Sequence, residues 1–310
     1  MAQSTSYVHY PMLMHVRDIL RRDKTIFSFE FFPPNTEKGW GALTNRLSKF
    51  EELEPSFVSV TYGAGGTTRT RTHDLVCQLS SNTALDPIPH LTCVGHTKEE
   101  IRLILQEYAD VGIDNILALR GDHPAKGCCN GDYAHAADLI DAIHEFEGAS
   151  FGVGIAGFPE GHPETPNRLV QLDHLKAKVD RGVDWMCTQL FFDNNAFFDW
   201  CHQCELVGIN TPTIAGIMPI TTISGMRRMA ELAGGANFPA TLQKRLYRFQ
   251  DDPESVRRVG VNWAAQQCAQ LLDGGVRGIH FFTMNQSSAT EEIYKALGAP
   301  SGSKLRGLHE

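Results

Sequence analysis

Short apolar segments rich in β-branched and aromatic residues recur along the chain, with more polar stretches between them. These segments cover residues 25–32, 57–63, 89–95, 115–121, 151–158, 185–192, 213–220 and 277–285. Most of them begin about 30 residues after the one before, which is the spacing expected of a strand followed by a helix. The pattern therefore predicts an α/β protein that is built from eight βα units.

The stretches between the apolar segments carry helix signals. Thr97 and Glu100 have the spacing of a capping box, in which Thr97 is the N-cap of the helix that follows. Gly182 follows Asp180 and Arg181 at a position that is typical of a helix end. The interval before the last strand is longer than the others, and residues 238–273 within it predict additional helical structure.

Eight alternating units form either a closed barrel or a large open, doubly wound sheet. The number eight favours a (β/α)8 TIM barrel, and no G-x-G-x-x-G dinucleotide fingerprint follows the first strand. The length of 310 residues suits a single barrel domain with insertions. We expect an N-terminal lead-in arm or helix over residues 1–24 and one catalytic barrel domain over residues 25–310, because no linker-like segment interrupts the sequence.

Side chains alternate between two faces in the first strand, TIFSFEFF. Phe27, Phe29 and Phe31 share the face that we expect to contact the outer helices. Ser28 and Glu30 share the other face, which points toward the barrel axis. A buried glutamate is costly unless it has a partner or a function, and active sites of this fold lie at the carboxyl ends of the strands. Glu30 is therefore the leading candidate for a functional residue.

Polar side chains also gather where the other strands end. They are Thr61, Tyr62, His90, Thr92, Arg120, Asp122, His162, Gln189 and Asp193. Each has a structural explanation when taken alone; Arg120 and Asp122, for example, can pair with each other. The glycine-rich segment 63–66 suits either a phosphate-bearing ligand or a plain turn. Lys178 and His174 are either contacts for a second phosphate or surface residues. The gathering of all these groups at one barrel end favours a site.

Composition and charge narrow the functional class. The chain is 42% hydrophobic and carries a net charge of −8 without a basic block, so we expect neither disorder nor nucleic-acid binding. No signal peptide or membrane span is recognisable, and the eight cysteines are scattered, so we expect a cytoplasmic protein. Cys201 and Cys204 form a C-x-x-C, but no second ligand pair follows, and we expect no metal.

Nine motifs occur in a specific order between about residues 25 and 297. They are FSFEFFPPNTEKG, FVSVTYGAGG, PHLTC, LALRGD, GFPEGHPE, LKAKVDRGVD, TQLFFDN, GIMPI and HFFTMN. Each is modest by itself, whereas nine in order and at similar spacing are specific. Together they make the chain resemble the methylenetetrahydrofolate reductase family.

The resemblance implies a (β/α)8 barrel that binds FAD non-covalently. NADH or NADPH would reduce the flavin, which would then pass hydride to 5,10-methylenetetrahydrofolate and give 5-methyltetrahydrofolate in a ping-pong reaction. Because the chain ends soon after the eighth strand, it is similar to the short bacterial form, for which a homo-oligomer is expected. The FAD contacts carried over by position are Thr61, Tyr62, Ala64, His90, Arg120, Gly121, Asp122, Ala134, Phe158, His162 and Lys178. Gln189 would contact folate or nicotinamide.

The same resemblance assigns the chemistry to two carboxyl groups, Glu30 and Asp122, which would both contact the substrate. Opening the methylene bridge of the folate requires a proton on the departing nitrogen. Glu30 matches the family's acid, and a desolvated barrel interior can raise its pKa from the usual value of about 4.3 toward neutrality. Asp122 would stay negative, favouring hydride donation by the flavin and stabilising the cationic iminium of the folate.

Some positions depart from the family pattern. Phe158 replaces a tyrosine, Gln171 a common aspartate, and Ala177 a common charged residue. Gln286 stands where the family usually has an arginine that meets the glutamyl tail of folate, and glutamine cannot make the same charge-assisted contact. Arg277 or Lys244 could supply the missing charge.

Two other functions remain open from the sequence. The same groups would serve an enzyme that oxidises methyltetrahydrofolate, because both directions use the same site. A barrel that binds flavin or folate without catalysis is the alternative from a different class. The retained Glu30 and Asp122 argue against it.

Overall fold

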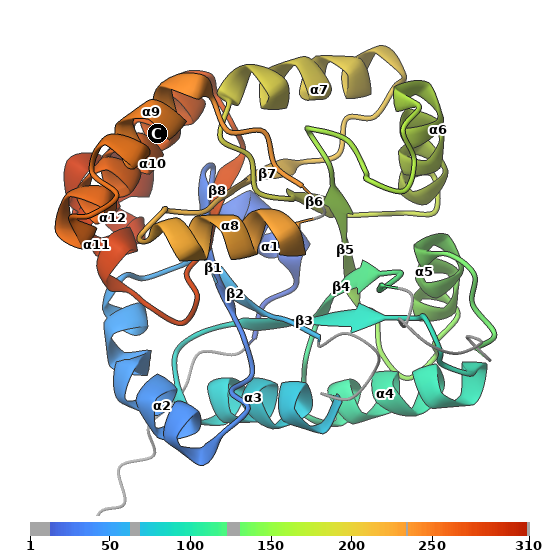
Figure 1. Ribbon diagram of the computed structural model, residues 1–310. Helices are drawn as coiled ribbons and strands as arrows, with labels where there is room; N and C mark the ends of the chain where they lie inside the picture. Colours follow the sequence, from blue (N-terminus) through green and yellow to red (C-terminus); the bar gives the residue numbers. More distant parts are fainter. Residues whose placement is uncertain (1–12, 63–68, 123–130, 234, 309–310) are drawn as a thin grey trace, which may run out of the picture.

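The structure is a computed structural model that describes residues 13–62, 69–122, 131–233 and 235–308 (Figure 1). Its eight parallel strands close into a barrel in sequence order, with the last strand beside the first. The strands are β1 (Ile26–Phe31), β2 (Phe57–Val60), β3 (Pro87–Thr92), β4 (Asn115–Leu119), β5 (Gly152–Gly157), β6 (Trp185–Thr188), β7 (Thr213–Ile217) and β8 (Gly278–Phe282). Each strand overlaps the apolar segment that predicted it, and the prediction of a (β/α)8 barrel is confirmed.

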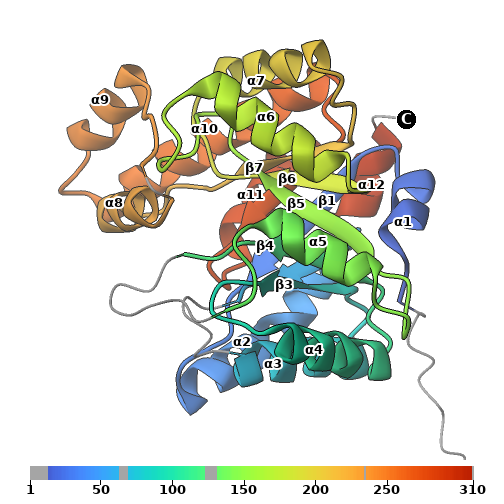
Figure 2. The same ribbon diagram turned by 90° about the vertical axis from the view of Figure 1, so that its right-hand side faces the viewer.

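Helices surround the barrel, and Figure 2 shows α8 and α9 at one of its ends and α1 at the other. They are α1 (Val16–Arg22), α2 (Glu37–Glu52), α3 (Arg69–Asn82), α4 (Lys98–Asp110), α5 (Ala136–His144), α6 (Arg168–Val179), α7 (Asn194–Leu206), α8 (Ile223–Leu232), α9 (Ala240–Arg248), α10 (Pro253–Asp273), α11 (Ser288–Ala296) and α12 (Gly302–Leu308). Because α9 and α10 fall within residues 238–273, the predicted helical insertion before the last strand is confirmed.

Local signals in the sequence account for the ends of several helices. At α4, the Thr97 side chain accepts a hydrogen bond from the Glu100 backbone N–H, and the Glu100 carboxylate accepts one from the Thr97 N–H, which is the predicted capping box. After α6, Gly182 has a φ of +96°, a left-handed conformation that glycine adopts without a steric cost. These signals therefore account for where α4 begins and for the turn that follows α6.

The first strand is buried on both faces, as its alternation predicts. Phe27, Phe29 and Phe31 pack outward; the Phe31 ring meets that of Phe50 on α2 at 4.7 Å, and the Phe27 ring meets that of Tyr294 on α11 at 5.6 Å. Glu30 lies on the opposite face, level with Ser59 of β2 and Phe282 of β8. The barrel axis therefore receives the polar side chains of this strand.

Helix α1 closes the amino-terminal end of the barrel. Its Val16 and Ile19 are fully buried in a second apolar cluster that includes Ile26, Phe57 and Trp185 of the barrel interior. Burying two such side chains contributes roughly 1.5–3 kcal/mol each. Residues 1–12 lie outside the described part of the chain, and the division between residues 24 and 25 stays a prediction.

None of the described helices is long and apolar enough to cross a membrane.

Candidate functional site at the carboxyl end of the barrel

Glu30 lies near the carboxyl end of β1, inside the barrel, with only 5% of its surface exposed. Burial raises the pKa of its carboxyl group to about 8. Among the described residues, no group donates a hydrogen bond to this carboxyl. The Glu30 side chain is therefore largely protonated at pH 7, which is the state that a general acid needs.

His90 of β3 faces Glu30 across the barrel interior. Its Nε2 lies 3.7 Å from Oε2 of Glu30 and has no hydrogen-bond partner within the described residues. Burial lowers the pKa of His90 to about 3, so the imidazole is neutral at pH 7. The separation falls within the range of an ion pair, but the shifted pKa values of Glu30 and His90 indicate that both buried groups are neutral at pH 7. An unpartnered buried nitrogen is costly, and a ligand atom can satisfy it.

Another buried histidine, His280 of β8, lies deeper in the barrel. Its Nδ1 is 2.8 Å from the Ser28 hydroxyl and its Nε2 is 3.4 Å from the Ser59 hydroxyl. Burial first, and then the proximity of His90, lower the pKa of His280 to about 3. The sequence reasoning missed His280 and Ser59, although the alternation in RGIHFFTMN places His280 on one face with Phe282, and Phe282 pairs with Glu30.

Charged groups collect after β4 and β5. Arg120 Nη2 donates to Glu164 Oε2 at 2.6 Å, so Arg120 pairs with Glu164 rather than with Asp122, which is exposed. The pKa of His162 is lowered, first by burial; Glu164 and Asp122 oppose this shift, while Arg120 and Lys178 add to it. These groups therefore lie within electrostatic reach of His162, as the prediction of one site requires.

Lys178 projects from α6 into this cluster. Burial lowers the pKa of its ammonium group to about 8, and no carboxylate among the described residues forms an ion pair with it. The Phe158 ring, after β5, contacts the His162 ring edge-on at a centroid distance of 4.7 Å. His174, the other suggested phosphate contact on α6, is exposed.

Backbone geometry explains one glycine of the site. Gly121 has a φ of +87°, and a Cβ at this position would lie 2.7 Å from Cγ1 of Val94 and 2.9 Å from Cβ of Thr92. Any other residue here would strain the backbone and displace the strand end that carries Arg120 and Asp122.

The remaining predicted residues have ordinary structural contacts. Tyr62 is buried, its hydroxyl lies 3.2 Å from Nε2 of His96, and burial raises its pKa to about 12. Thr61 donates its backbone N–H to the Phe31 carbonyl at 2.9 Å. Gln189 is half-buried after β6. Ala134 is exposed and donates its N–H to Asp138. Ala64, with the glycine-rich segment 63–66, lies outside the described residues.

The suggestion that Arg277 replaces the missing arginine at position 286 is wrong. Arg277 precedes β8, at the amino-terminal end of the barrel, and donates a hydrogen bond to the Leu20 carbonyl of α1. Gln286 lies beyond the opposite end of that strand and is exposed. Lys244 is an exposed residue of α9, which lies at the end of the barrel opposite α1 (Figure 2).

The donor set at this end of the barrel fits an anionic, planar cofactor such as FAD. Arg120 and Lys178 suit a diphosphate, and the unpartnered Nε2 of His90 is free to form a hydrogen bond with a polar atom of a ring system. No group of three metal-ligating side chains occurs within the described ranges. Cys201 and Cys204, the C-x-x-C of α7, are free thiols.

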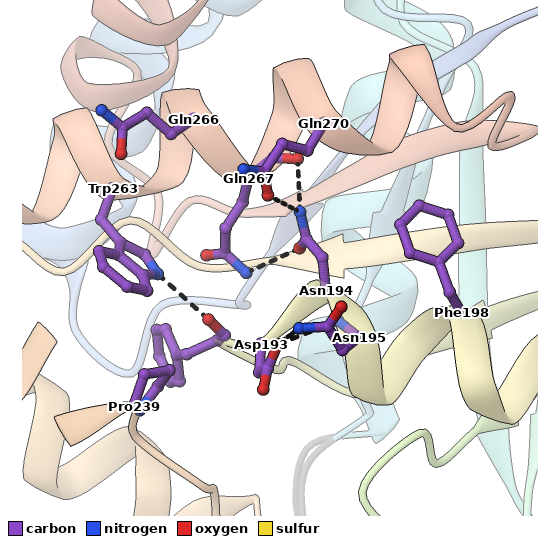
Figure 3. Close-up of a pocket in the computed structure, with 10 residues that line it drawn as sticks. Asp193, Asn194, Asn195, Phe198, Pro239, Trp263, Gln266, Gln267 and Gln270 are labelled. Atoms are coloured by element: carbon purple, nitrogen blue, oxygen red, sulfur yellow. Dashed lines mark hydrogen bonds between the residues drawn. The ribbon is translucent and has the colours of Figure 1, made fainter. Parts of the chain in front are cut away.

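A cavity of about 480 Å³ lies away from these groups, between α7 and α10 (Figure 3). Its amides bind one another: Asn194 Nδ2 donates to Gln270 Oε1 at 3.0 Å, and Gln267 Nε2 donates to Asn194 Oδ1 at 3.2 Å. The Trp263 indole N–H donates to the Phe192 carbonyl. Among the lining residues Asp193 alone is ionisable, and its carboxylate caps α7. The cavity thus lacks the acid, base and cations that the barrel end provides.

The fold and the site together define a class, that of a (β/α)8-barrel protein with a buried acid and a cationic rim at the carboxyl ends of its strands. Residues 15–298 match the family model described as "Methylenetetrahydrofolate reductase". The chain belongs to the methylenetetrahydrofolate reductase family.

Several named proteins are similar to the chain. It is 35% identical over 275 residues to "5,10-methylenetetrahydrofolate reductase" of Escherichia coli, covering 89% of this chain and 91% of that protein. It is 38% identical over 283 residues to "Methylenetetrahydrofolate reductase 2" of Saccharomyces cerevisiae, covering 88% and 47%. The protein "Methylenetetrahydrofolate reductase (NADH) 1" of Arabidopsis thaliana is 35% identical over 303 residues, covering 94% and 51%. The chain thus spans about half the length of the plant and yeast relatives.

A solved structure shares the fold. It is described as an uncharacterized protein from Clostridium thermocellum that binds two copies of 5-methyl-5,6,7,8-tetrahydrofolic acid, and it aligns with a TM-score of 0.67 at 14% identity over 95% of this chain and 98% of that one. At this identity, the likeness concerns the barrel alone.

Proposed function

We propose that this protein is an FAD-dependent reductase that converts 5,10-methylenetetrahydrofolate to 5-methyltetrahydrofolate with NADH or NADPH as the electron donor. Family membership supports the reaction class. The observation that carries the proposal is Glu30, a buried carboxyl group with a pKa of about 8 at the end of the strands where barrel enzymes act.

FAD, when bound, supplies the chemistry of accepting a hydride from the nicotinamide and delivering it to the folate. Arg120, His162 and Lys178 would hold its diphosphate, and His90 would meet a polar atom of its ring system. Thr61, Tyr62, Ala64, Gly121, Asp122, Ala134 and Phe158 complete the proposed FAD contacts. The loss of the tyrosine hydroxyl at Phe158 leaves an aromatic surface, which packs against His162.

Glu30 would donate a proton to the folate nitrogen that departs when the methylene bridge opens. Its pKa of about 8 suits this step, because an acid with a pKa near the working pH is protonated and still releases its proton readily. The bridge then opens to an iminium on the folate, which accepts hydride. Asp122, at the mouth of the barrel, would place negative charge beside that cation, and Gln189 would orient folate or nicotinamide.

The half-reactions can be measured separately. We expect anaerobic NADH or NADPH to bleach protein-bound FAD, and methylenetetrahydrofolate to restore its absorbance. Glu30→Gln should leave the bleaching largely unchanged and slow the reoxidation on the order of 100-fold or more, because only the second step needs the acid. Absence of flavin binding after addition of FAD, or equal survival of both half-reactions in Glu30→Gln, would contradict the proposal.

The same experiment addresses the alternatives. A methyltetrahydrofolate oxidase would reduce FAD with methyltetrahydrofolate faster than NAD(P)H does. A non-catalytic binding barrel would retain FAD and folate but show neither half-reaction. A cytoplasmic location and a homo-oligomer stay predictions from the sequence, as does the absence of membrane and nucleic-acid partners.

A further inference from the structure

The segment after β8 folds back onto the end of β1 in an unusual conformation. Met284 and Asn285 both have left-handed backbone angles, with φ of +51° and +57°. Asparagine tolerates this region better than most residues, whereas a methionine there is rare and strained. Met284 is 43% exposed and has no burial to offset the strain. Contacts made by its neighbours must therefore hold the turn.

Those contacts go to the strand that carries Glu30. The Thr283 hydroxyl donates to the Glu30 carbonyl at 2.9 Å in a buried hydrogen bond. Asn285 Oδ1 accepts from the Phe32 N–H at 2.9 Å, and its Nδ2 donates to the Phe32 carbonyl at 2.8 Å. The regular pairing of β1 with β8 ends at Glu30 and Phe282, so the Asn285 amide supplies the donor and acceptor that a further strand residue would have offered.

The main chain matters for Glu30 because its carboxyl has no hydrogen bond to any described residue. Nε2 of His90 lies 3.7 Å from Oε2 of Glu30, which is beyond hydrogen-bonding distance. The place of the carboxyl, and its isolation from water, depend on the path of β1 between Ser28 and Phe32. Holding the chain at Glu30 and again at Phe32 fixes that path from both sides.

We propose that Asn285 is a positioning residue for the acid: its side chain clamps the end of β1 and so holds the Glu30 carboxyl in the desolvated barrel interior. This inference rests on the proposed function for the identity of the acid. Asn285 directly precedes Gln286, the position at which the family resemblance places the folate tail. The short turn that contains Asn285 and Gln286 therefore connects the proposed folate-tail position to the strand that carries Glu30.

The chain offers variants that separate the clamp from the turn. Asn285→Gly retains the freedom to adopt a positive φ and removes both hydrogen bonds. Asn285→Asp keeps the size and the acceptor, and removes the donor to the Phe32 carbonyl. Met284→Gly relieves the strained neighbour while leaving the clamp in place. Thermal unfolding of each variant establishes that it is folded.

The first readout does not need activity. Infrared titration of the FAD-loaded protein, with the Glu30 band assigned by its loss in Glu30→Gln, follows the protonated carboxyl. We expect the midpoint to fall toward the ordinary glutamate value in Asn285→Gly and Asn285→Asp, because a displaced carboxyl becomes hydrated. Met284→Gly should keep the wild-type midpoint. An unchanged midpoint in both Asn285 variants, or an equal shift in Met284→Gly, overturns the inference.

The second readout is the rate of each half-reaction against pH. In Asn285→Gly we expect FAD reduction by NAD(P)H within about twofold of the wild type, and folate-dependent reoxidation slowed on the order of tenfold, with its high-pH fall displaced to lower pH. Equal loss in both half-reactions overturns the positioning role. If the wild type itself lacks the folate half-reaction, the proposed function fails, while the infrared midpoint still decides whether Asn285 controls Glu30.

Discussion

The Glu30 carboxyl lies 3.7 Å from Nε2 of His90, and burial leaves both groups neutral at pH 7. An acid and a base so close in water would exchange a proton and form an ion pair. In the barrel, desolvation raises the pKa of the first and lowers that of the second, so the proton stays on the carboxyl group. The Glu30–His90 pair therefore carries a proton that Glu30 can donate, and the pair has no net charge.

The first prediction concerns stability against pH. Folding raises the pKa of Glu30 from 4.5 to about 8. The contribution of Glu30 to the free energy of unfolding is therefore fully present below the unfolded pKa and is lost as the pH rises through 8. The free energy of unfolding that the wild type loses through Glu30 between low pH and pH values above 8 approaches roughly 5 kcal/mol. We expect Glu30→Gln to gain in unfolding free energy relative to the wild type between about pH 4.5 and 8.

Urea unfolding without ligand, at several pH values, measures this gain. The comparison isolates Glu30 because the other shifted groups, including Asp86 with a pKa raised to about 7 by burial, are present in both proteins. A difference that is constant with pH would show that Glu30 is not desolvated in solution.

The second prediction concerns FAD affinity. Lys178→Met should raise the dissociation constant of FAD about tenfold or more, because a buried ammonium that meets a diphosphate forms a charge-assisted hydrogen bond. Lys176→Met is the control on the same helix, since Lys176 pairs with Asp180. Since the pKa of Lys178 is about 8 before binding, wild-type affinity should also decline as the pH rises above 8. Fluorescence titration of FAD measures both effects, and equal losses in the two variants would remove Lys178 from the site.

The third prediction concerns the departure at Gln286. Gln286→Arg should lower the KM for folate substrates several-fold without changing FAD reduction by NAD(P)H, because the exposed position gains a cation for the glutamyl carboxylates. The gain should shrink at high salt. Steady-state kinetics at two ionic strengths measure it. A salt-independent KM identical to that of the wild type would place the folate tail elsewhere.

The fourth prediction concerns the buried hydroxyls beneath the acid. Ser28→Ala should cost about 1–3 kcal/mol of unfolding free energy, since it leaves Nδ1 of His280 without its partner at 2.8 Å. Ser59→Ala should cost less, because its contact with Nε2 of His280 is longer, at 3.4 Å. Chemical denaturation ranks the two. The reverse order would mean that the Ser59 contact is the stronger one.

Much of the fold follows from local pattern. The alternation in β1 predicts which side chains face the helices, and the spacing of Thr97 and Glu100 predicts the start of α4. Both depend on residues close in sequence, where the strand and helix periods operate. Glu30 could be singled out for the same reason, as a polar residue on an inward face.

Contacts between distant residues could not be predicted in this way. His280 meets Ser28 across 252 positions, and the Asn285 clamp on Phe32 spans 253. Arg120 pairs with Glu164 and not with its near neighbour Asp122, because the loop after β5 brings the Glu164 carboxylate beside Arg120. These pairings depend on the closure of the barrel. The periodicity of residues within a single strand or helix therefore cannot predict them.

Helix α1 gives the barrel a closed floor. Val16 and Ile19 seal the amino-terminal end over a layer of Ile26, Phe57 and Trp185, and Asn115 ties the helix in place through the Val16 N–H. Apolar side chains therefore pack this end of the barrel, and under the proposed function the Glu30 carboxyl would be reprotonated from the opposite end, where the ligands are proposed to bind. Under the proposed function, ligands that fill that end would delay the reprotonation of Glu30 until the product has departed.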